Sequence, residues 1–427
     1  MLNGAYKYYV LGMLTLVYTM NFIDRNLIIL LLQPIKEDLH LSDTQLGFVT
    51  GITFGLFYAV VGLPVARIAD RGGNRSTITS VAIALWGCTV MVCLVVSSFV
   101  QLVFARVAAA VGEAGCMPPT YSLLGDYFPD PAERIRAMAV YWLGVPLSAL
   151  ISLIAGGWLN ERYGWRFTMF AMGVPALVVA VVFKMTVADP RKRAHTQFKD
   201  MRVRSMIGLL ATLWRQESSR HLSVAIVLLF SMSSGLAPWY GAFMMRSHGM
   251  GTAELGLWLG LIFGSSGIVG SLLGGYVTGR WFSTNERGQM RLIAILIAAL
   301  VPCHLLFLLL PHKHQALLAM SPLGVVFVSI YGPTFALLQR LVPDDMRATT
   351  LAVVMMLANL IGMGVGPQIV GILSDLLAPV MGLDSLRYAM LVVSLVAVWA
   401  AYHFWRVGQT VTADLAALPA NHRAAIP

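Results

Sequence analysis

Twelve long apolar runs constrain the fold of this 427-residue chain more than any other feature. A helix needs about 20 mostly apolar residues to cross the roughly 30 Å hydrocarbon core of a bilayer. Hydrophobic residues make up 58% of the chain and charged residues only 12%, too few charges to cover a soluble domain. We therefore predict an all-α membrane protein. Its transmembrane helices are expected at 8–32, 45–66, 77–97, 100–124, 137–158, 167–187, 222–245, 255–279, 291–310, 315–339, 348–374 and 387–406.

One connection between these runs is much longer than the others, and it divides the chain into six runs plus six. It is rich in Lys and Arg, so we expect a solvated connector that lies against an anionic membrane leaflet. The predicted parts are an N-terminal six-helix bundle at 1–187, a cytoplasmic basic linker at 188–221, a C-terminal six-helix bundle at 222–407 and a cytoplasmic tail at 408–427.

The distribution of positive charge predicts the orientation in the membrane. With the N-terminus placed inside, 22 of the 30 Lys and Arg residues fall in inner segments and 6 in outer segments. Cytoplasmic loops of membrane proteins carry such an excess of Lys and Arg. We therefore expect an integral membrane protein with both termini in the cytoplasm.

The two halves carry a similar arrangement of Pro and Gly. Pro119 corresponds to Pro333 and Pro129 to Pro343, both at an offset of 214 residues, and a Gly-rich run follows in each half. Two six-helix halves related by such a repeat are typical of transporters with a substrate path between the halves. The pattern therefore predicts two pseudo-symmetric bundles that alternate in their access to the two sides.

The loop after the second run has a motif of its own. Asp70-Arg71-Gly-Gly-Asn-Arg75 resembles the signature of the major facilitator superfamily, although Ala66 stands where Gly is usual and Asn74 where a basic residue is usual. The carboxylate can meet a helix N-terminus, and the guanidinium groups can meet acidic side chains or helix C-termini on the opposite half. Asp70, Arg71 and Arg75 are therefore predicted to form a conformational latch.

Four charged residues lie inside predicted spans, where charge is costly and usually functional. Asp24 and Arg25 are in the first span, and Arg106 and Glu113 are in the fourth. A separation of seven residues puts Arg106 and Glu113 on one helix face, about 10 Å apart along the axis. Asp24 and Arg106 lie at similar depths, so we predict that they form an ion pair.

Glu113 lies deeper, near the midplane, and has no obvious matched cation unless Arg25 reaches it. A carboxyl group withdrawn from water favours its neutral form. Glu113 is therefore a predicted proton-coupling residue, able to bind and release a proton near neutral pH. A purely structural network of ion pairs is the alternative.

These residues also carry a closer resemblance. Asn21-Phe22-Ile23-Asp24-Arg25-Asn26, Ser42-Asp43-Thr44-Gln45-Leu46-Gly47 and Arg106 with Glu113-Ala114-Gly115 resemble the Spinster branch of the superfamily. The resemblance implies a proton-coupled exporter of a lysophospholipid or sphingolipid in a bacterial inner or plasma membrane. It implies that Asp24 and Glu113 are proton-sensitive, with Arg25 and Arg106 as their partners and head-group contacts.

The offset of 214 residues also predicts what faces the charged residues. Asp24 and Arg25 correspond to Pro238 and Trp239, and Glu113 corresponds to Phe327. We expect Trp239 and Phe327 to form an apolar wall that takes the chain of an amphipathic substrate. Packing between helices is the alternative role for both aromatic residues.

Several other functions lack support in the sequence. We find no nucleotide-binding, metal-binding or hydrolase motif in a suitable context, so we expect no cofactor, no metal and no enzymatic activity. The basic residues lie in short loops, which is unlike a nucleic-acid-binding face. The expected partners are the substrate, protons and membrane lipids, with the protein a monomer. Two alternatives remain, namely an organic anion symporter in which Arg25 and Arg106 bind a carboxylate, and a receptor or scaffold that does not transport.

Overall fold

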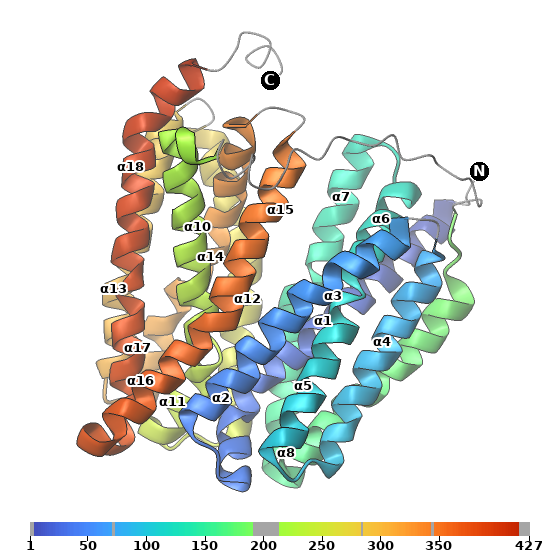
Figure 1. Ribbon diagram of the computed structural model, residues 1–427, viewed down its shortest axis with the longest axis vertical. Helices are drawn as coiled ribbons and strands as arrows, with labels where there is room; N and C mark the ends of the chain where they lie inside the picture. The colour runs from blue at the N-terminus through green and yellow to red at the C-terminus, as the bar shows by residue number, and fades with distance from the viewer. Residues whose placement is uncertain (1–3, 71–72, 191–212, 283–284, 343–345, 418–427) are drawn as a thin grey trace. The chain divides into compact units, whose positions relative to one another are not determined.

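The computed structural model describes residues 4–70, 73–190, 213–282, 285–342 and 346–417. These residues form helices and short connections without a strand (Figure 1). The predicted linker lies largely outside the described residues, as does the end of the predicted tail.

The first half of the chain forms eight helices that follow the predicted apolar runs closely. Three of the runs are each built from two helices, because the helix is interrupted near Gly51, near Gly115 and near Leu143. The helices are α1 (Gly4–Leu39), α2 (Asp43–Thr50), α3 (Ile52–Asp70), α4 (Arg75–Val92), α5 (Phe99–Ala114), α6 (Met117–Tyr127), α7 (Pro131–Trp142) and α8 (Gly144–Thr186).

The second half follows its apolar runs in the same way. A break at Pro238 separates the first two helices, and a π-helical segment (Asn359–Val365) lies in the Gly-rich run. The helices are α10 (Glu217–Leu236), α11 (Trp239–His248), α12 (Thr252–Trp281), α13 (Glu286–Leu309), α14 (Lys313–Arg340), α15 (Arg347–Ala358), α16 (Gly366–Met381), α17 (Ser385–Ser394) and α18 (Val396–Ala416).

The described helices account for twelve membrane crossings. Nine helical stretches are long and apolar enough to cross a membrane. Two of them hold two crossings each, because Gly164 interrupts Arg136–Thr186 with a φ of 78° and Gly382 interrupts Thr349–Ala416 with a φ of 56°. The twelfth crossing is α3, which matches the second apolar run. The predicted all-α membrane fold is confirmed.

The chain forms two compact units whose limits differ from the predicted halves. One unit contains Met1–Gln197 and Ala237–Ser265, and the other contains Phe198–Leu236 and Ser266–Pro427. Helix α11 and the first part of α12 therefore pack with the first six crossings. The division into bundles at 1–187 and 222–407 stays a prediction.

A close helix contact supports α5, which carries two of the charged residues. A Cβ atom at Gly112 would lie 2.8 Å from the backbone nitrogen of Trp86 in α4 and 2.9 Å from its Cα. Real side chains do not tolerate such distances to backbone, so only glycine lets α5 approach α4 this closely. Trp86 itself is 1% exposed. The contact fixes the position of Glu113, the next residue along α5.

We expect the Gly112→Ala substitution to destabilise the protein, because the added methyl group meets rigid backbone. Overpacking of this kind costs about 1–3 kcal/mol. Gly275→Ala is the matched control, since a Cβ atom there meets nothing within 4 Å. Thermal unfolding of the two purified variants in detergent should show a lower midpoint for Gly112→Ala alone. Equal midpoints would contradict the packing account.

Candidate functional site

The four charged residues predicted inside spans come together between α1 and α5. Asp24 and Arg25 lie in the middle of α1, and Arg106 and Glu113 lie two turns apart on α5. Residues seven apart share a face of a helix, so both side chains of α5 point towards α1. The site is thus built from two helices of the first compact unit.

Asp24 and Arg106 form the predicted ion pair. The Nη1 atom of Arg106 donates to Oδ2 of Asp24. The side chains are 1% and 3% exposed, so both charges are withdrawn from solvent. An ion pair without water is maintained only where the partners are well placed, because each charge alone carries a large desolvation cost. The prediction of this pair is confirmed.

Glu113 pairs with Arg25, the partner that the sequence left open. The Nε atom of Arg25 lies 2.7 Å from Oε2 of Glu113. The carboxylate is fully buried, whereas the guanidinium side chain is 18% exposed. Of the four charged side chains, Arg25 is therefore the one with appreciable access to a ligand.

Aromatic rings surround the guanidinium group of Arg25. Its central carbon lies 4.8 Å from the ring centroid of Phe22, 4.9 Å from Phe54 and 4.8 Å from Tyr58. Arg106 lies over the same Phe54 ring at 5.2 Å. Cations bind to aromatic faces more strongly when both are withdrawn from water. The rings thus stabilise the charge of Arg25 and give the site an amphipathic character.

The carboxylates keep unused capacity for hydrogen bonds. Among the described residues, Oδ1 of Asp24 and Oε1 of Glu113 have no hydrogen-bond partner although both atoms are buried. Asn21 donates to the backbone carbonyl of Glu113 at 3.3 Å, and not to its carboxylate. Each carboxylate therefore has one oxygen at which a proton can be held without breaking an existing contact.

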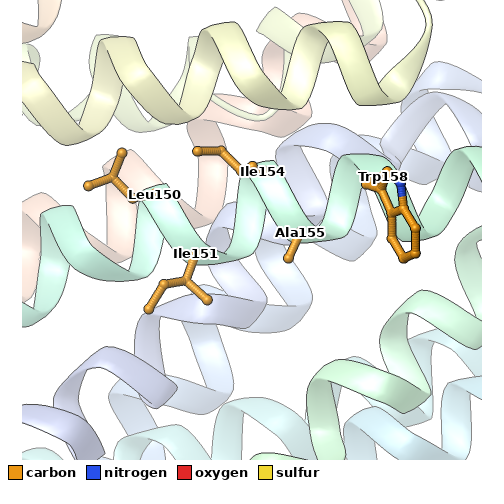
Figure 2. A pocket seen from close by; sticks show the side chains of 5 residues that line it. All are labelled: Leu150, Ile151, Ile154, Ala155 and Trp158. Carbon is orange, nitrogen blue, oxygen red and sulfur yellow. The ribbon is translucent and has the colours of Figure 1, made fainter.

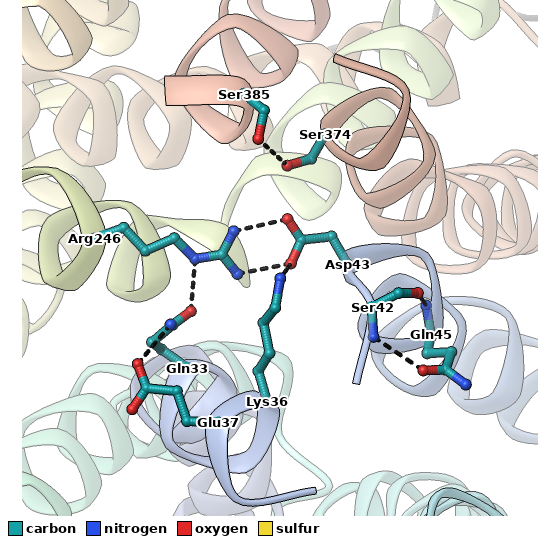
Figure 3. A network of polar contacts seen from close by, with 9 residues as sticks. All are labelled: Gln33, Lys36, Glu37, Ser42, Asp43, Gln45, Arg246, Ser374 and Ser385. Carbon is teal, nitrogen blue, oxygen red and sulfur yellow. Dashed lines mark hydrogen bonds and ion pairs between the residues drawn. The ribbon is translucent and has the colours of Figure 1, made fainter. Parts of the chain in front are cut away.

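A second buried ion pair, which the sequence did not predict, joins α2 to α11 (Figure 3). Arg246 binds Asp43 through two hydrogen bonds of 2.7 Å, and its Nε donates to Gln33 at 2.6 Å. Lys36 lies 2.5 Å from the same carboxylate, and Gln33 donates to Glu37. We call these five residues the Asp43 cluster. Asp43 is 3% and Arg246 is 9% exposed.

Local sequence places Asp43 at the start of α2. Ser42 caps the helix by accepting from the backbone of Gln45, and the side chain of Gln45 accepts from the backbone of Ser42. This reciprocal cap fixes the first turn and directs Asp43 towards Arg246. The Ser-Asp-Thr-Gln pattern is visible in the sequence, but its partner 203 residues away is not.

Arg75, one of the three predicted latch residues, is fully buried within the first compact unit. Its guanidinium group lies 2.7 Å from Asp126 of α6 and 2.9 Å from Ser122. It also binds Asp189, which accepts from the backbone of Arg75 at 2.8 Å. These contacts tie α4 to α6 and to the segment that follows α8. The conformational latch stays a prediction. The side chain of Asp70 and all of Arg71 lie outside the described residues.

The two predicted apolar-wall residues lie in different compact units. Trp239 is fully buried in α11 of the first unit, and Phe327 is partly buried in α14 of the second. Their role as an apolar wall stays a prediction. A separate apolar hollow of about 570 Å³ lies along α8 (Figure 2). Its lining consists of Leu150, Ile151, Ile154, Ala155 and Trp158.

No group of three or more His, Cys, Asp or Glu side chains in the described ranges is arranged to hold a metal ion. The charged site itself contains carboxylates, guanidinium groups and aromatic rings. Such a set can exchange protons and bind an anion.

Known proteins resemble the chain over nearly its whole length. The sequence matches the family described as Major Facilitator Superfamily over residues 14–367. It is 31% identical over 405 residues to an "MFS-type efflux pump" of Mycolicibacterium smegmatis, covering 95% of this chain and 93% of that one. It is 23% identical over 422 residues to "Protein spinster homolog 1" of Xenopus tropicalis, covering 92% and 79%.

A solved structure shows the same similarity. A bacterial homologue of the human lysosomal transporter Spinster, in an inward-facing and unoccupied conformation, matches with a TM-score of 0.82 and 27% identity. The match covers 96% of this chain and 99% of that one. The resemblance to the Spinster branch is thus confirmed.

The Asp24–Arg106 pair predicts how the unfolding midpoints of the single variants and of the double variant should compare. Removing one partner leaves the other as an unpaired buried charge, which costs about 3–5 kcal/mol. We expect Asp24→Asn and Arg106→Gln each to lower the unfolding midpoint strongly, and the double variant to lower it less than the sum. Thermal unfolding in detergent measures this double-mutant cycle. Additive effects would contradict the pairing.

Proposed function

The chain belongs to the major facilitator superfamily, and we propose that it transports an amphipathic anionic lipid, such as a lysophospholipid or an anionic sphingolipid, together with protons. The single observation that carries this proposal is the buried Glu113–Arg25 pair, in which the carboxylate is fully buried and the guanidinium group is 18% exposed. Transporters of this fold bind their substrate near the middle of the membrane, between repeats.

Arg25 is the proposed contact for the head group. It is more exposed than Asp24, Arg106 or Glu113, and Phe22, Phe54 and Tyr58 surround it. A guanidinium group binds phosphate through directed, charge-assisted hydrogen bonds. Neighbouring rings suit the first methylene groups of an acyl chain. The combination favours an amphipathic anion over a fully hydrated one.

Protonation of Glu113 is the proposed coupling step. While Glu113 is ionised, it neutralises Arg25 at 2.7 Å and competes with any other anion. A proton on Glu113 removes that negative charge and leaves Arg25 with an uncompensated positive charge. An anionic head group then restores neutrality. Binding of the lipid and binding of the proton are therefore expected to favour each other.

The Asp43 cluster is the proposed closure on the outer side. It joins α2 to α11, which comes from the second half of the sequence, through a bidentate pair that is almost completely buried. With the predicted orientation, both termini are cytoplasmic and this cluster lies at the outer ends of the helices. Breaking it is the step that opens the outer side during alternating access.

We expect binding of lysophosphatidylglycerol to weaken as the pH rises, because ionised Glu113 competes for Arg25. The limit is about tenfold per pH unit when one proton is linked to binding. The phosphodiester of this lipid keeps its charge over the range tested, so the protein supplies the pH dependence. In Glu113→Gln, which mimics the protonated state, affinity should be independent of pH. Equilibrium binding to purified protein between about pH 5.5 and 8.5 measures both.

Glu161→Gln is the matched control, because its amide oxygen can still accept from the backbone of Ala253. It should keep the pH dependence of the wild type. An unchanged pH dependence in Glu113→Gln would remove Glu113 from the coupling step. Proteoliposomes that carry small dicarboxylates and not the lysolipid would support the organic anion symporter, and flux of neither would support a receptor or scaffold.

We expect Asp43→Asn and Arg246→Gln to shift the protein towards a conformation open on the side of the Asp43 cluster. Truncating one partner of such a buried pair costs about 2–5 kcal/mol. Spin labels at an exposed site on α1 and at the half-buried Ser247 of α11 should report longer distances in both variants. Glu37→Gln is the control, since Asp43 and Arg246 keep their contacts. Unchanged distances in all three variants would contradict the closure.

A further inference from the structure

A cavity outside the charged site opens between the first turns of α1 and the middle of α7. Its volume is about 370 Å³. Helix α1 contributes Tyr8, Leu11 and Gly12 to the lining, and α7 contributes Ala137 and Val140. Leu11 precedes Asp24 by 13 residues, which places the cavity about 20 Å away along α1. The cavity is therefore separate from the proposed transport site.

The wall of this cavity is apolar and the rim is charged. Leu11 and Ala137 are 6% and 2% exposed, so they form the buried floor of the cavity. Val140 is 41% exposed and lies at its open side. Glu133 and Arg136 of α7 line the same cavity. Glu133 pairs with Lys7 at 2.7 Å, so these two charges offset each other.

Arg136 supplies the positive charge that remains at the rim. Its side chain is exposed, and it has no ion-pair or hydrogen-bond partner within the described part of the chain. The neighbouring Arg134 differs, because its guanidinium group donates to the backbone carbonyls of Phe128, Gly125 and Pro129. The free guanidinium group thus points to an anionic ligand.

Aromatic groups place the rim at the level of lipid head groups. Tyr8 is 59% exposed, and the Nζ atom of Lys7 lies 5.4 Å from its ring centroid and 5.6 Å from that of Phe128. Tyrosine and lysine near the end of a transmembrane helix are typical of the membrane interface. Basic pockets between helices on the cytoplasmic side bind the head groups of anionic lipids.

We propose that this cavity is a binding site for an anionic phospholipid of the surrounding membrane. The phosphate pairs with Arg136, with Lys7 close by, and one acyl chain lies on Leu11, Gly12, Ala137 and Val140. An inorganic or other fully soluble anion would leave this apolar wall uncovered, and a zwitterionic lipid would leave the positive charge uncompensated. The bound lipid would hold α1 against α7.

The experiment is native mass spectrometry of the full-length protein with phosphatidylglycerol or phosphatidylethanolamine added at equal concentrations. We expect the wild type to retain phosphatidylglycerol preferentially. Arg136→Gln should reduce this retention about fivefold, the effect of one basic residue near an anionic surface. Gly12→Leu should also reduce retention, because a side chain there meets nothing within 4 Å and extends into the cavity.

Each variant has a matched control. Arg280→Gln removes an exposed arginine elsewhere, and Gly275→Leu adds a side chain at an exposed helical glycine with open space. Both should retain phosphatidylglycerol as the wild type does. Equal retention of the two lipids by the wild type would overturn the proposal. So would equal losses in Arg136→Gln and Arg280→Gln, or in Gly12→Leu and Gly275→Leu. None of these readouts depends on transport.

Discussion

The pairing of buried carboxylates with buried guanidinium groups is the constraint on which the rest of this structure depends. Asp24 and Glu113 are 1% and 0% exposed, and each would be too costly in the membrane interior without Arg106 or Arg25. The pairs force α1 and α5 into one register. The close approach of Gly112 to Trp86 then fixes α5 against α4. The need to pair buried charges thus determines how α1, α5 and α4 pack against one another.

The same pairing explains how one site can respond to two ligands. The two pairs differ in exposure, because Asp24–Arg106 is closed to solvent whereas Arg25 is 18% exposed. The Asp24–Arg106 pair is suited to holding α1 and α5 together. The Arg25–Glu113 pair is suited to separating when a ligand binds. A proton on Glu113 releases Arg25, and an anionic head group can then neutralise it. Coupling then needs no further residue, only a change of partner for Arg25.

The crossings and the Asp24–Arg106 pair could be predicted from the sequence for simple physical reasons. The length of an apolar run indicates whether the run can cross the membrane. The number of residues between a charge and the end of its run indicates how deep the charge lies in the membrane. The Asp43–Arg246 pair could not be predicted, because it depends on where α11 packs rather than on depth. Nor could the sequence predict that Asp126 and Asp189 of the same unit bind Arg75. Long-range partners of this kind follow from tertiary packing alone.

The central claim is that an anionic lipid takes the place of Glu113 beside Arg25 while Glu113 takes up a proton. The most direct measurement is the number of protons exchanged when lysophosphatidylglycerol binds, obtained by calorimetry in buffers of different ionisation enthalpy near neutral pH. The account predicts uptake of up to about one proton by the wild type and none by Glu113→Gln. Lipid binding to the wild type without proton uptake would contradict it.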